Sequence, residues 1–250
     1  MENQPYLSVV VPAYKDEERI GRTLLEIQKY FNDKNYEWEI IVVLDGSPDN
    51  TGEIVKNYAN RIKNFRVIEN KENHGKGCSV RQGLLEAKGK RRLFMDADGS
   101  TSITHLDKFL PEMENGYDIV IGSRYIEGAF VQIHQGKMRE TMGKIGNLMI
   151  KIILGLWKYS DTQCGFKIIS GKAVDEVVKK MTVDRFGFDF ELIKLAEVLG
   201  FKIKQMPVRW LNEEGSTVTL FGPNSFIQSL VDLFKTRYGL LTGKYNLKAK

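Results

Sequence analysis

Arg92-Leu93-Phe94-Met95-Asp96-Ala97-Asp98-Gly99-Ser100-Thr101 is a short apolar run that ends in two carboxylates with one small residue between them. The apolar part predicts the end of a buried strand, and Asp96-Ala97-Asp98-Gly99 predicts the turn that leaves it. Ligands of open α/β sheets bind just outside the carboxyl ends of the strands. Asp96 and Asp98 could therefore share one Mg²⁺ or Mn²⁺ that keeps open positions for substrate phosphates. Taken alone, the motif is more often a solvated Asp-Gly turn.

The composition narrows the choice of partners. The chain has 250 residues, enough for one large α/β domain or two small ones, and a formal net charge of +5. A positive charge favours anionic partners such as nucleic acid, nucleotide phosphates or an acidic membrane surface. Cys78 and Cys164 are too few for a disulfide framework or a zinc site, which indicates a reducing compartment. Residues 1–5 lack the features of a signal peptide, and no apolar run reaches the roughly 18 residues of a membrane-spanning helix.

Strand-like and helix-like segments alternate from the N-terminus onward. Buried strands are expected over 7–12 and 38–44, and further strands over 65–68 and 117–121, in addition to the strand that ends before Asp96. Helices are expected over 16–31, between the second and third strands, and after Gly77. This alternation predicts a parallel sheet wound by right-handed crossovers. Because neither a repeat nor a clear linker interrupts it, we expect a single domain over residues 1–250.

Polar residues follow three of the predicted strands, in Tyr14-Lys15-Asp16-Glu17, Asp45-Gly46-Ser47 and Asp96-Ala97-Asp98. The exits of parallel strands lie on one edge of the sheet, which predicts a binding site there. A fourth segment, Asn73-His74-Gly75-Lys76-Gly77, places a lysine between glycines at a helix start, where backbone N–H groups and the helix dipole favour an anion. The chain has neither a Walker loop nor the dinucleotide-binding glycine pattern after its first strand, which argues against kinases and dehydrogenases.

Two later segments have the periodicity of amphipathic helices. In the first, over about 137–158, apolar residues recur at three- and four-residue spacing from Met138 to Trp157, and basic residues surround this stripe. Such a helix suits a membrane interface, although periodicity alone slightly favours a core or dimer helix. The second segment, 226–241, has the same character. The presence of two such segments favours the membrane surface, and a homo-oligomer stays an alternative.

Five motifs stand in the order in which one enzyme family carries them: Pro12-Ala13-Tyr14, Asp45-Gly46-Ser47, Gly75-Lys76-Gly77, Asp96-Ala97-Asp98 and Gly122-Ser123-Arg124. With them the chain resembles the GT-A glycosyltransferases of family 2. Further segments are similar to the dolichyl-phosphate β-glucosyltransferases: Asp161-Thr162-Gln163-Cys164-Gly165-Phe166-Lys167, the stretch 185–192, and Val208-Arg209-Trp210 followed by Glu214-Gly215-Ser216. The resemblance covers nearly the whole chain.

The resemblance implies a GT-A, Rossmann-like α/β fold, in which helices flank a mostly parallel sheet and amphipathic helices lie at a membrane interface. Residues 1–125 would bind the nucleotide sugar, 126–220 would bind the acceptor, and 221–250 would form a C-terminal amphipathic segment. The implied reaction is inverting transfer of a sugar, first of all glucose, from a UDP-sugar to dolichyl or polyprenyl phosphate on the cytoplasmic face of a membrane. Another sugar such as N-acetylglucosamine, or a protein, glycan or soluble acceptor, is an alternative.

The resemblance also implies roles for single residues. The nucleotide sugar would lie against Pro12, Ala13, Tyr14, Asp16, Asp45, Lys76, Asp96, Ala97, Asp98 and Arg124. Asp96 and Asp98 would hold Mg²⁺ or Mn²⁺. Arg139, Gln163 and Lys167 would bind the acceptor. The catalytic set would be Asp96, Asp98, Arg139 and Asp161.

Three residues depart from the family pattern. Leu44 stands where the family usually has a first acid, so that only Asp45 can reach the base or ribose. Ser100 stands where related mannose synthases carry Gln as a further metal contact. Thr217 stands where a Lys near the diphosphate is common.

The chemistry explains why a strong general base is not needed. A divalent cation with Arg and Lys partners would neutralise the leaving diphosphate, and a lipid phosphate is largely ionised at neutral pH because its second pKa is about 6. His74, His105 and His134 are scattered, and each is predicted to be a surface or loop residue. Cys164 is expected to be a packed small side chain, not a nucleophile.

Two alternatives remain. Asp189 and Glu191 could be a second acid pair, but on the helix expected there they fit capping and ion pairs better. A basic peripheral membrane or nucleic-acid-binding module is the non-enzyme alternative. Nucleic acid is disfavoured because no basic stripe is interleaved with aromatic residues.

Overall fold

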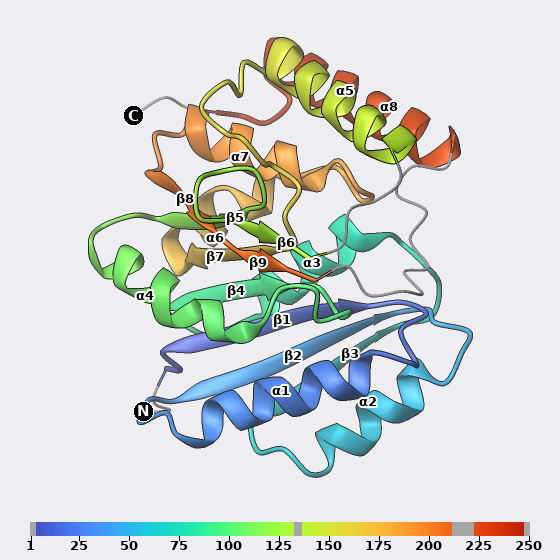
Figure 1. The fold of residues 1–250 in the computed structure, drawn as a ribbon, viewed down its shortest axis with the longest axis vertical. Helices are drawn as coiled ribbons and strands as arrows, with labels where there is room; N and C mark the ends of the chain where they lie inside the picture. Colours follow the sequence, from blue (N-terminus) through green and yellow to red (C-terminus); the bar gives the residue numbers. More distant parts are fainter. Residues whose placement is uncertain (1–3, 133–136, 212–222, 248–250) are drawn as a thin grey trace.

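The computed structural model describes residues 4–132, 137–211 and 223–247, without the side chains of 137–142 and 223–225. Its centre is a sheet with the strand order β3-β2-β1-β4-β7-β5-β8, covered by helices on both faces (Figure 1). The strand β7 runs antiparallel to β4 and β5, and the other pairs of neighbouring strands are parallel. The predicted α/β class with a mostly parallel sheet is therefore confirmed.

The first half of the chain builds β3, β2, β1 and β4 with their crossover helices. Its elements are β1 (Leu7–Ala13), α1 (Ile20–Asn32), β2 (Trp38–Asp45), α2 (Thr51–Ala59), β3 (Phe65–Asn70), α3 (Lys76–Glu86) and β4 (Arg91–Met95). The expected helix over 16–31 begins only at Ile20, because Arg19 N–H donates to Asp16 O in a turn that precedes it.

The second half completes the sheet and adds the outer helices. Its elements are η1 (Ile103–His105), α4 (Leu106–Glu114), β5 (Ile119–Ser123), β6 (Phe130–Val131), α5 (Lys137–Leu154), β7 (Phe166–Ser170), α6 (Gly171–Glu176), η2 (Val178–Lys180), α7 (Phe188–Val198), β8 (Ile203–Pro207), β9 (Arg209–Trp210) and α8 (Pro223–Leu241). The short strands β6 and β9 pair with each other. The strand expected over 117–121 begins at Ile119, because Asp118 N–H bonds to Lys202 O outside the ladder.

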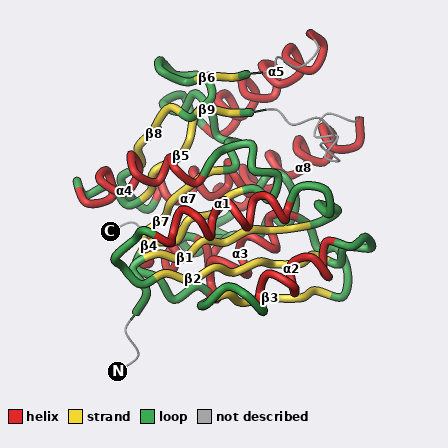
Figure 2. Tube along the Cα trace, turned by 60° about the horizontal axis from the view of Figure 1, so that its bottom comes forward, coloured by secondary structure: helices red, strands yellow, loops and turns green. Residues whose placement is uncertain are grey.

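The sheet has a separate apolar core on each face because side chains alternate along each strand. Val9 and Val11 face α1, α2 and α4, whereas Val10 faces α3, α6 and α7. Figure 2 shows the strands between these helices. Because both faces are covered, the strands read as continuous apolar runs in the sequence, which is why they were predictable.

The helices α5 and α8 lie side by side at the outside of the molecule (Figure 1). The predicted helix over about 137–158 ends at Leu154, because Gly155 takes a left-handed conformation with φ 71°. Large apolar side chains on this helix pair are exposed, among them Ile152 (61%), Phe234 (56%) and Tyr238 (68%). Within the described ranges, none of the helices has the length and apolarity needed to cross a bilayer.

Candidate functional site

The strands β1, β2, β4 and β5 all end at one edge of the sheet, since they run in the same direction. This edge brings together segments that are far apart in the sequence: Tyr14 to Asp16 after β1, Asp45 at the end of β2, Asp96 to Asp98 after β4, and Arg124 after β5. The glycine-flanked Lys76 begins α3 beside them. The structure thus assembles the polar strand exits that the sequence singles out.

Asp96 is paired with Lys76. Lys76 Nζ lies 2.7 Å from Asp96 Oδ1, and the two side chains keep 27% and 29% of their surface exposed. Burial lowers the pKa of Lys76, but the carboxylates of Asp96, Asp189 and Asp98 outweigh burial and the net shift of this pKa is upward. The ammonium group therefore stays charged and occupies the position next to Asp96 that a cation could take.

Gly165 makes room for the Asp96 carboxylate. A Cβ added to Gly165 would overlap the carboxylate carbon and both oxygens of Asp96. The two residues also share a backbone bond, from Asp96 N–H to Gly165 O at 3.1 Å. Glycine is therefore required at this position by close approach. The sequence motif around Gly165 gives no sign of this contact.

Asp98 and Asp16 lie at the same edge, Asp98 half-buried and Asp16 buried. Asp98 Oδ1 accepts a bond from Ser100 N–H at 2.9 Å, and burial together with the nearby Asp96 raises the pKa of Asp98. Asp16 is ion-paired with Arg19 and accepts a bond from Tyr14 N–H at 3.1 Å. Burial raises the pKa of Asp16 despite the Arg19 guanidinium. These raised values mean that added positive charge would be stabilised here.

A buried ion pair lies beneath the edge. Lys167 is fully buried, where it is paired with Asp189 and donates to Cys164 O at 2.6 Å. Lys76 and Lys167 each lie 5.6 Å from the centroid of the Phe94 ring. Cys164 is 1% exposed, as its predicted packing role requires, and burial raises its pKa to about 12, which disfavours a thiolate.

The local charges favour a cation. The carboxylates of Asp96, Asp98 and Asp189 outnumber the ammonium groups of Lys76 and Lys167 by one negative charge. In the described part of the chain, no group of three or more His, Cys, Asp or Glu residues forms a complete metal cage. The residues at this edge fit Mg²⁺ or Mn²⁺ of the kind that takes one or two carboxylates and completes its shell with substrate phosphates.

Asp45 organises the glycine-flanked loop. Its oxygens accept bonds from His74 N–H at 3.0 Å, Gly75 N–H at 2.8 Å and Asn70 Nδ2 at 3.3 Å, and the residue is 3% exposed. The carboxylate therefore holds the start of α3 against the end of β2. Its contact with a base or ribose, expected from the sequence, stays a prediction.

Arg124 forms a hydrogen-bonded ion pair with Asp161. Arg124 donates from its backbone N–H at 3.1 Å, from Nε at 2.7 Å and from Nη2 at 3.0 Å, and Gln163 N–H donates to the same carboxylate at 3.1 Å. Although burial opposes charge on Asp161, the guanidinium outweighs it and the pKa of Asp161 is lowered. The guanidinium carbon of Arg124 lies 5.6 Å from the centroid of the Trp210 ring, a contact that the sequence did not predict.

Some of the remaining predicted site residues are described by the structure, and others lie outside the described ranges. Pro12, Ala13 and Ala97 are buried at the ends of β1 and β4, and Ala97 O accepts a bond from Thr23 Oγ1 at 2.8 Å. Tyr14 is 37% exposed at the edge. The Arg139 side chain, His134, Glu214-Gly215-Ser216 and Thr217 lie outside the described residues.

Asp189 and Glu191 belong to the interior. Asp189 pairs with Lys167, and Glu191, which is fully buried, accepts bonds from Thr182 N–H at 2.9 Å, Val183 N–H at 3.0 Å and Tyr245 Oη at 2.8 Å. The contact with Lys167 confirms the ion pair predicted for Asp189, whereas Glu191 binds backbone N–H groups that precede α7 instead of capping that helix. His105 was expected at the surface or in a loop; it is half-buried, with both ring nitrogens in contact with backbone groups.

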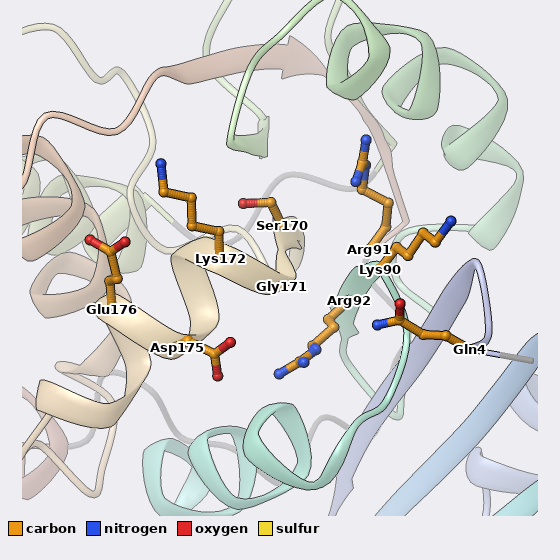
Figure 3. Close-up of a pocket in the computed structure, with 9 residues that line it drawn as sticks. All are labelled: Gln4, Lys90, Arg91, Arg92, Ser170, Gly171, Lys172, Asp175 and Glu176. Atoms are coloured by element: carbon orange, nitrogen blue, oxygen red, sulfur yellow. The ribbon is translucent and has the colours of Figure 1, made fainter. Parts of the chain in front are cut away.

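A cavity of about 560 Å³ lies at the opposite end of β4 from Asp96, between residues 90–92 and 170–176. Figure 3 shows Arg92 and Asp175 on either side of it. Arg92 is 8% exposed and donates hydrogen bonds to Gly89 O and Leu84 O. The cavity is therefore separate from the polar strand exits.

Residues 8–177 match the sequence profile described as "Glycosyl transferase family 2". A relative from Trichomonas vaginalis named "Dolichyl-phosphate beta-glucosyltransferase ALG5D" is 34% identical over 93% of this chain and 73% of its own length. The Drosophila melanogaster "Dolichyl-phosphate beta-glucosyltransferase" is 34% identical over 99% of this chain and 79% of its own.

Among solved structures, glucosyl-3-phosphoglycerate synthase from Mycobacterium tuberculosis, in complex with Mn²⁺, UDP-glucose and phosphoglyceric acid, superimposes with a TM-score of 0.68 at 18% identity. The match covers 94% of this chain and 80% of that one. At this identity the likeness establishes the GT-A fold.

Proposed function

The chain belongs to glycosyl transferase family 2, and we propose that it transfers glucose from UDP-glucose to dolichyl or another polyprenyl phosphate, with inversion at the anomeric carbon. The observation that carries this proposal is the sheet edge with Asp96 and Asp98 beside Lys76, in a chain one-third identical over almost its full length to enzymes named for that reaction. We further propose that residues 1–250 act as one domain, with a donor half (1–125), an acceptor half (126–220) and a C-terminal amphipathic segment (221–250).

The donor lies at the sheet edge in this proposal. Pro12, Ala13, Tyr14, Asp16 and Ala97 line the nucleotide, and Asp45 holds the loop that carries Lys76. Asp96 and Asp98 would hold Mg²⁺ or Mn²⁺, which when bound supplies positive charge to the leaving UDP. Lys76, which now pairs with Asp96, is placed to contact the diphosphate as Asp96 changes partner.

The acceptor phosphate needs binding and orientation but no strong base, because it is already ionised at neutral pH. Arg139 at the start of α5 and Gln163 are our candidates for contacting it. Lys167 acts from beneath the site, since its ammonium group is enclosed with Asp189. Arg124 and Asp161 fix the wall between the two substrates through their paired bonds.

The lipid tail would lie along the outer helix pair. Ile152 on α5 and Phe234 on α8 are 61% and 56% exposed, and Lys144 and Lys235 on the same helices are exposed as well. An apolar face with basic residues matches an anionic membrane surface, and we place the protein peripherally on its cytoplasmic side. The free thiols of Cys78 and Cys164 accord with a reducing compartment.

The function is tested by UDP release from UDP-glucose with and without dolichyl phosphate, in Mn²⁺ or in excess chelator. We expect turnover to require both the lipid phosphate and the cation. Asp98→Asn should lower turnover on the order of a hundred-fold, because it removes charge from the cation site, while Asp33→Asn, on an exposed helix end, should not change it. Turnover that persists in chelator, or that is independent of lipid phosphate, would contradict the proposal.

Membrane binding is tested by co-sedimentation with phosphatidylcholine vesicles that contain or lack phosphatidylserine. Ile152→Ser combined with Phe234→Ser should weaken binding, whereas Leu25→Ser on α1, at a residue 40% exposed, should not. Salt should release the protein, because surface charges are screened beyond about 8 Å at physiological ionic strength. If the double variant binds vesicles normally but changes the sedimentation of the free protein, the helix pair is a contact between copies of the chain.

A further inference from the structure

His105 links two parts of the chain through its imidazole ring. Its Nδ1 lies 3.0 Å from Ser102 O, and its Nε2 accepts a hydrogen bond from Arg209 N–H at 2.8 Å. A carbonyl oxygen can only accept, and a backbone N–H can only donate. The two contacts are therefore satisfied together only by the neutral ring with its proton on Nδ1. A doubly protonated ring would turn an N–H toward the N–H of Arg209.

The strand that His105 holds lies along the loop after the paired carboxylates. Ser100 N–H bonds to Asp98 Oδ1 at 2.9 Å, and Leu211 N–H bonds to Ser100 O at 2.8 Å. Thr101 forms an isolated β-bridge with Trp210. His105 adds the bond to Arg209, so that β9 is tied along one side to residues 100–105.

The same strand forms a wall of the site. Trp210 lies 5.6 Å from the guanidinium carbon of Arg124, which is bound to Asp161. Along its other side β9 pairs with β6, and Phe130 N–H donates to Val208 O at 3.1 Å. A shift of β9 would therefore move Trp210 away from the Arg124–Asp161 pair.

The surroundings of His105 favour the neutral ring. The ring is packed edge-on against Phe166, with centroids 6.0 Å apart, and burial lowers the pKa of His105 by more than the bond to Ser102 O raises it. Of the charged groups around it, Lys108 on α4 also lowers this pKa, whereas Glu26 on α1 raises it. The side chain of Arg209 lies over Phe130, 5.3 Å from that ring.

We propose that His105 is a positioning residue for glycosyl transfer: its neutral imidazole holds β9, and through β9 it keeps Trp210 against Arg124. This role rests on the proposed function of the site. The contribution is present above the ordinary histidine pKa of about 6.5 and is lost as the pH falls through the lowered pKa of His105 in the folded protein.

Two variants distinguish the effect of losing the hydrogen-bond acceptor of His105 from the effect of protonating its ring. In His105→Gln the side-chain carbonyl can accept from Arg209 N–H but does not titrate near neutrality. In His105→Phe the ring can still pack on Phe166, but Arg209 N–H loses its acceptor. Transfer to dolichyl phosphate is measured for both variants and the wild type between pH 5 and 8, at saturating UDP-glucose and Mn²⁺.

The ratio of wild-type to His105→Gln activity isolates His105, because every other titrating group is common to both proteins. We expect this ratio to be constant at pH 7–8 and to fall below the pKa of His105 until it levels off roughly ten-fold lower, the loss expected when the acceptor is removed. His105→Phe should lose roughly ten-fold in kcat/KM at all pH values. In NMR spectra of the wild type, the Arg209 amide should shift with the same midpoint as the His105 ring.

The outcomes separate the two proposals. A wild-type protein that transfers glucose, with a ratio to His105→Gln that does not change with pH, would overturn the role of His105 alone. If His105→Phe fails to fold, the pH dependence of the ratio of wild-type to His105→Gln activity still tests the role of His105. A wild-type protein that does not transfer glucose would overturn the proposed function, and with it the role of His105 in transfer.

Discussion

Replacing Arg124 with Met should destabilise the protein strongly, because it leaves the Asp161 carboxylate buried without its charged partner. Asp161 is 2% exposed and receives four hydrogen bonds, two of which come from the Arg124 side chain at 2.7 and 3.0 Å. A hydrogen bond to a charged group contributes about 1.5–3 kcal/mol, and removing one partner of a buried ion pair costs about 3–5 kcal/mol. We therefore expect the free energy of unfolding to fall by about 3–5 kcal/mol at pH 7.

The stability difference between the wild type and Arg124→Met should depend on pH in a definite direction. In the wild type the pKa of Asp161 is lowered, so its ionised form stabilises the fold above the ordinary aspartate pKa of about 3.9, and this contribution is lost as the pH falls through the lowered value. In Arg124→Met burial should raise the same pKa, and the ionised form then costs stability as the pH rises. The difference between the two proteins should therefore grow from pH 4 to pH 7, by about 1.4 kcal/mol for each unit between the two pKa values.

Urea unfolding at pH 4.5 and pH 7 measures this difference. Asp175→Asn is the control, because Lys179 and Asp175 form an ion pair whose side chains are 60% and 56% exposed, and such pairs contribute at most about 1 kcal/mol. A cost for Arg124→Met that is as small as that of Asp175→Asn at both pH values would refute the reasoning. Arg124 would then be available to substrate phosphate, as the sequence motif implies.

Three further predictions concern residues around the site. Gly165→Ala should weaken Mn²⁺ binding about 10- to 100-fold in a calorimetric titration by displacing Asp96, whereas Gly52→Ala, with 3.7 Å to Leu44 Cδ1, should have no effect. Tyr245→Phe should cost about 1.5–3 kcal/mol in thermal unfolding, because it removes a 2.8 Å bond to the buried Glu191. Lys76→Gln should strengthen the binding of Mn²⁺ alone and weaken the binding of UDP, since Lys76 competes for Asp96 and carries charge for the diphosphate.

The sequence was sufficient for the sheet and its strand exits, because these follow from local patterns. Strands covered on both faces read as apolar runs, and the polar residues after β1, β2 and β4 stand directly at their ends. The antiparallel β7 was not predictable in the same way. It enters between β4 and β5 from residues 166–170, and its register, with Phe94 opposite Lys167, depends on contacts far apart in the sequence.

The roles of the charged residues were harder to predict than their presence. Arg124 and Lys167 look alike in the sequence as cations beside a phosphate site, but their partners Asp161 and Asp189 are 37 and 22 residues away along the chain. Only the fold decides that Lys167 is enclosed with Asp189 and that Arg124 is bound to Asp161. The same limit applies to His105, whose acceptor role depends on a strand that begins at Arg209.

Lys76 differs from Lys167 and Arg124 because its ion pair can exchange partners at a lower cost. The Lys167 side chain is wholly buried with Asp189, and Arg124 makes two side-chain bonds to an Asp161 side chain that is 2% exposed, so exchanging either partner would leave a buried charge uncompensated. Lys76 and Asp96 keep 27% and 29% of their side chains exposed, so that water can solvate each as they separate. A divalent cation on Asp96 and a diphosphate on Lys76 would replace one ion pair with two, without stranding a charge in the interior. The neutralised pair in the free protein is therefore arranged so that donor and metal bind together more favourably than either alone.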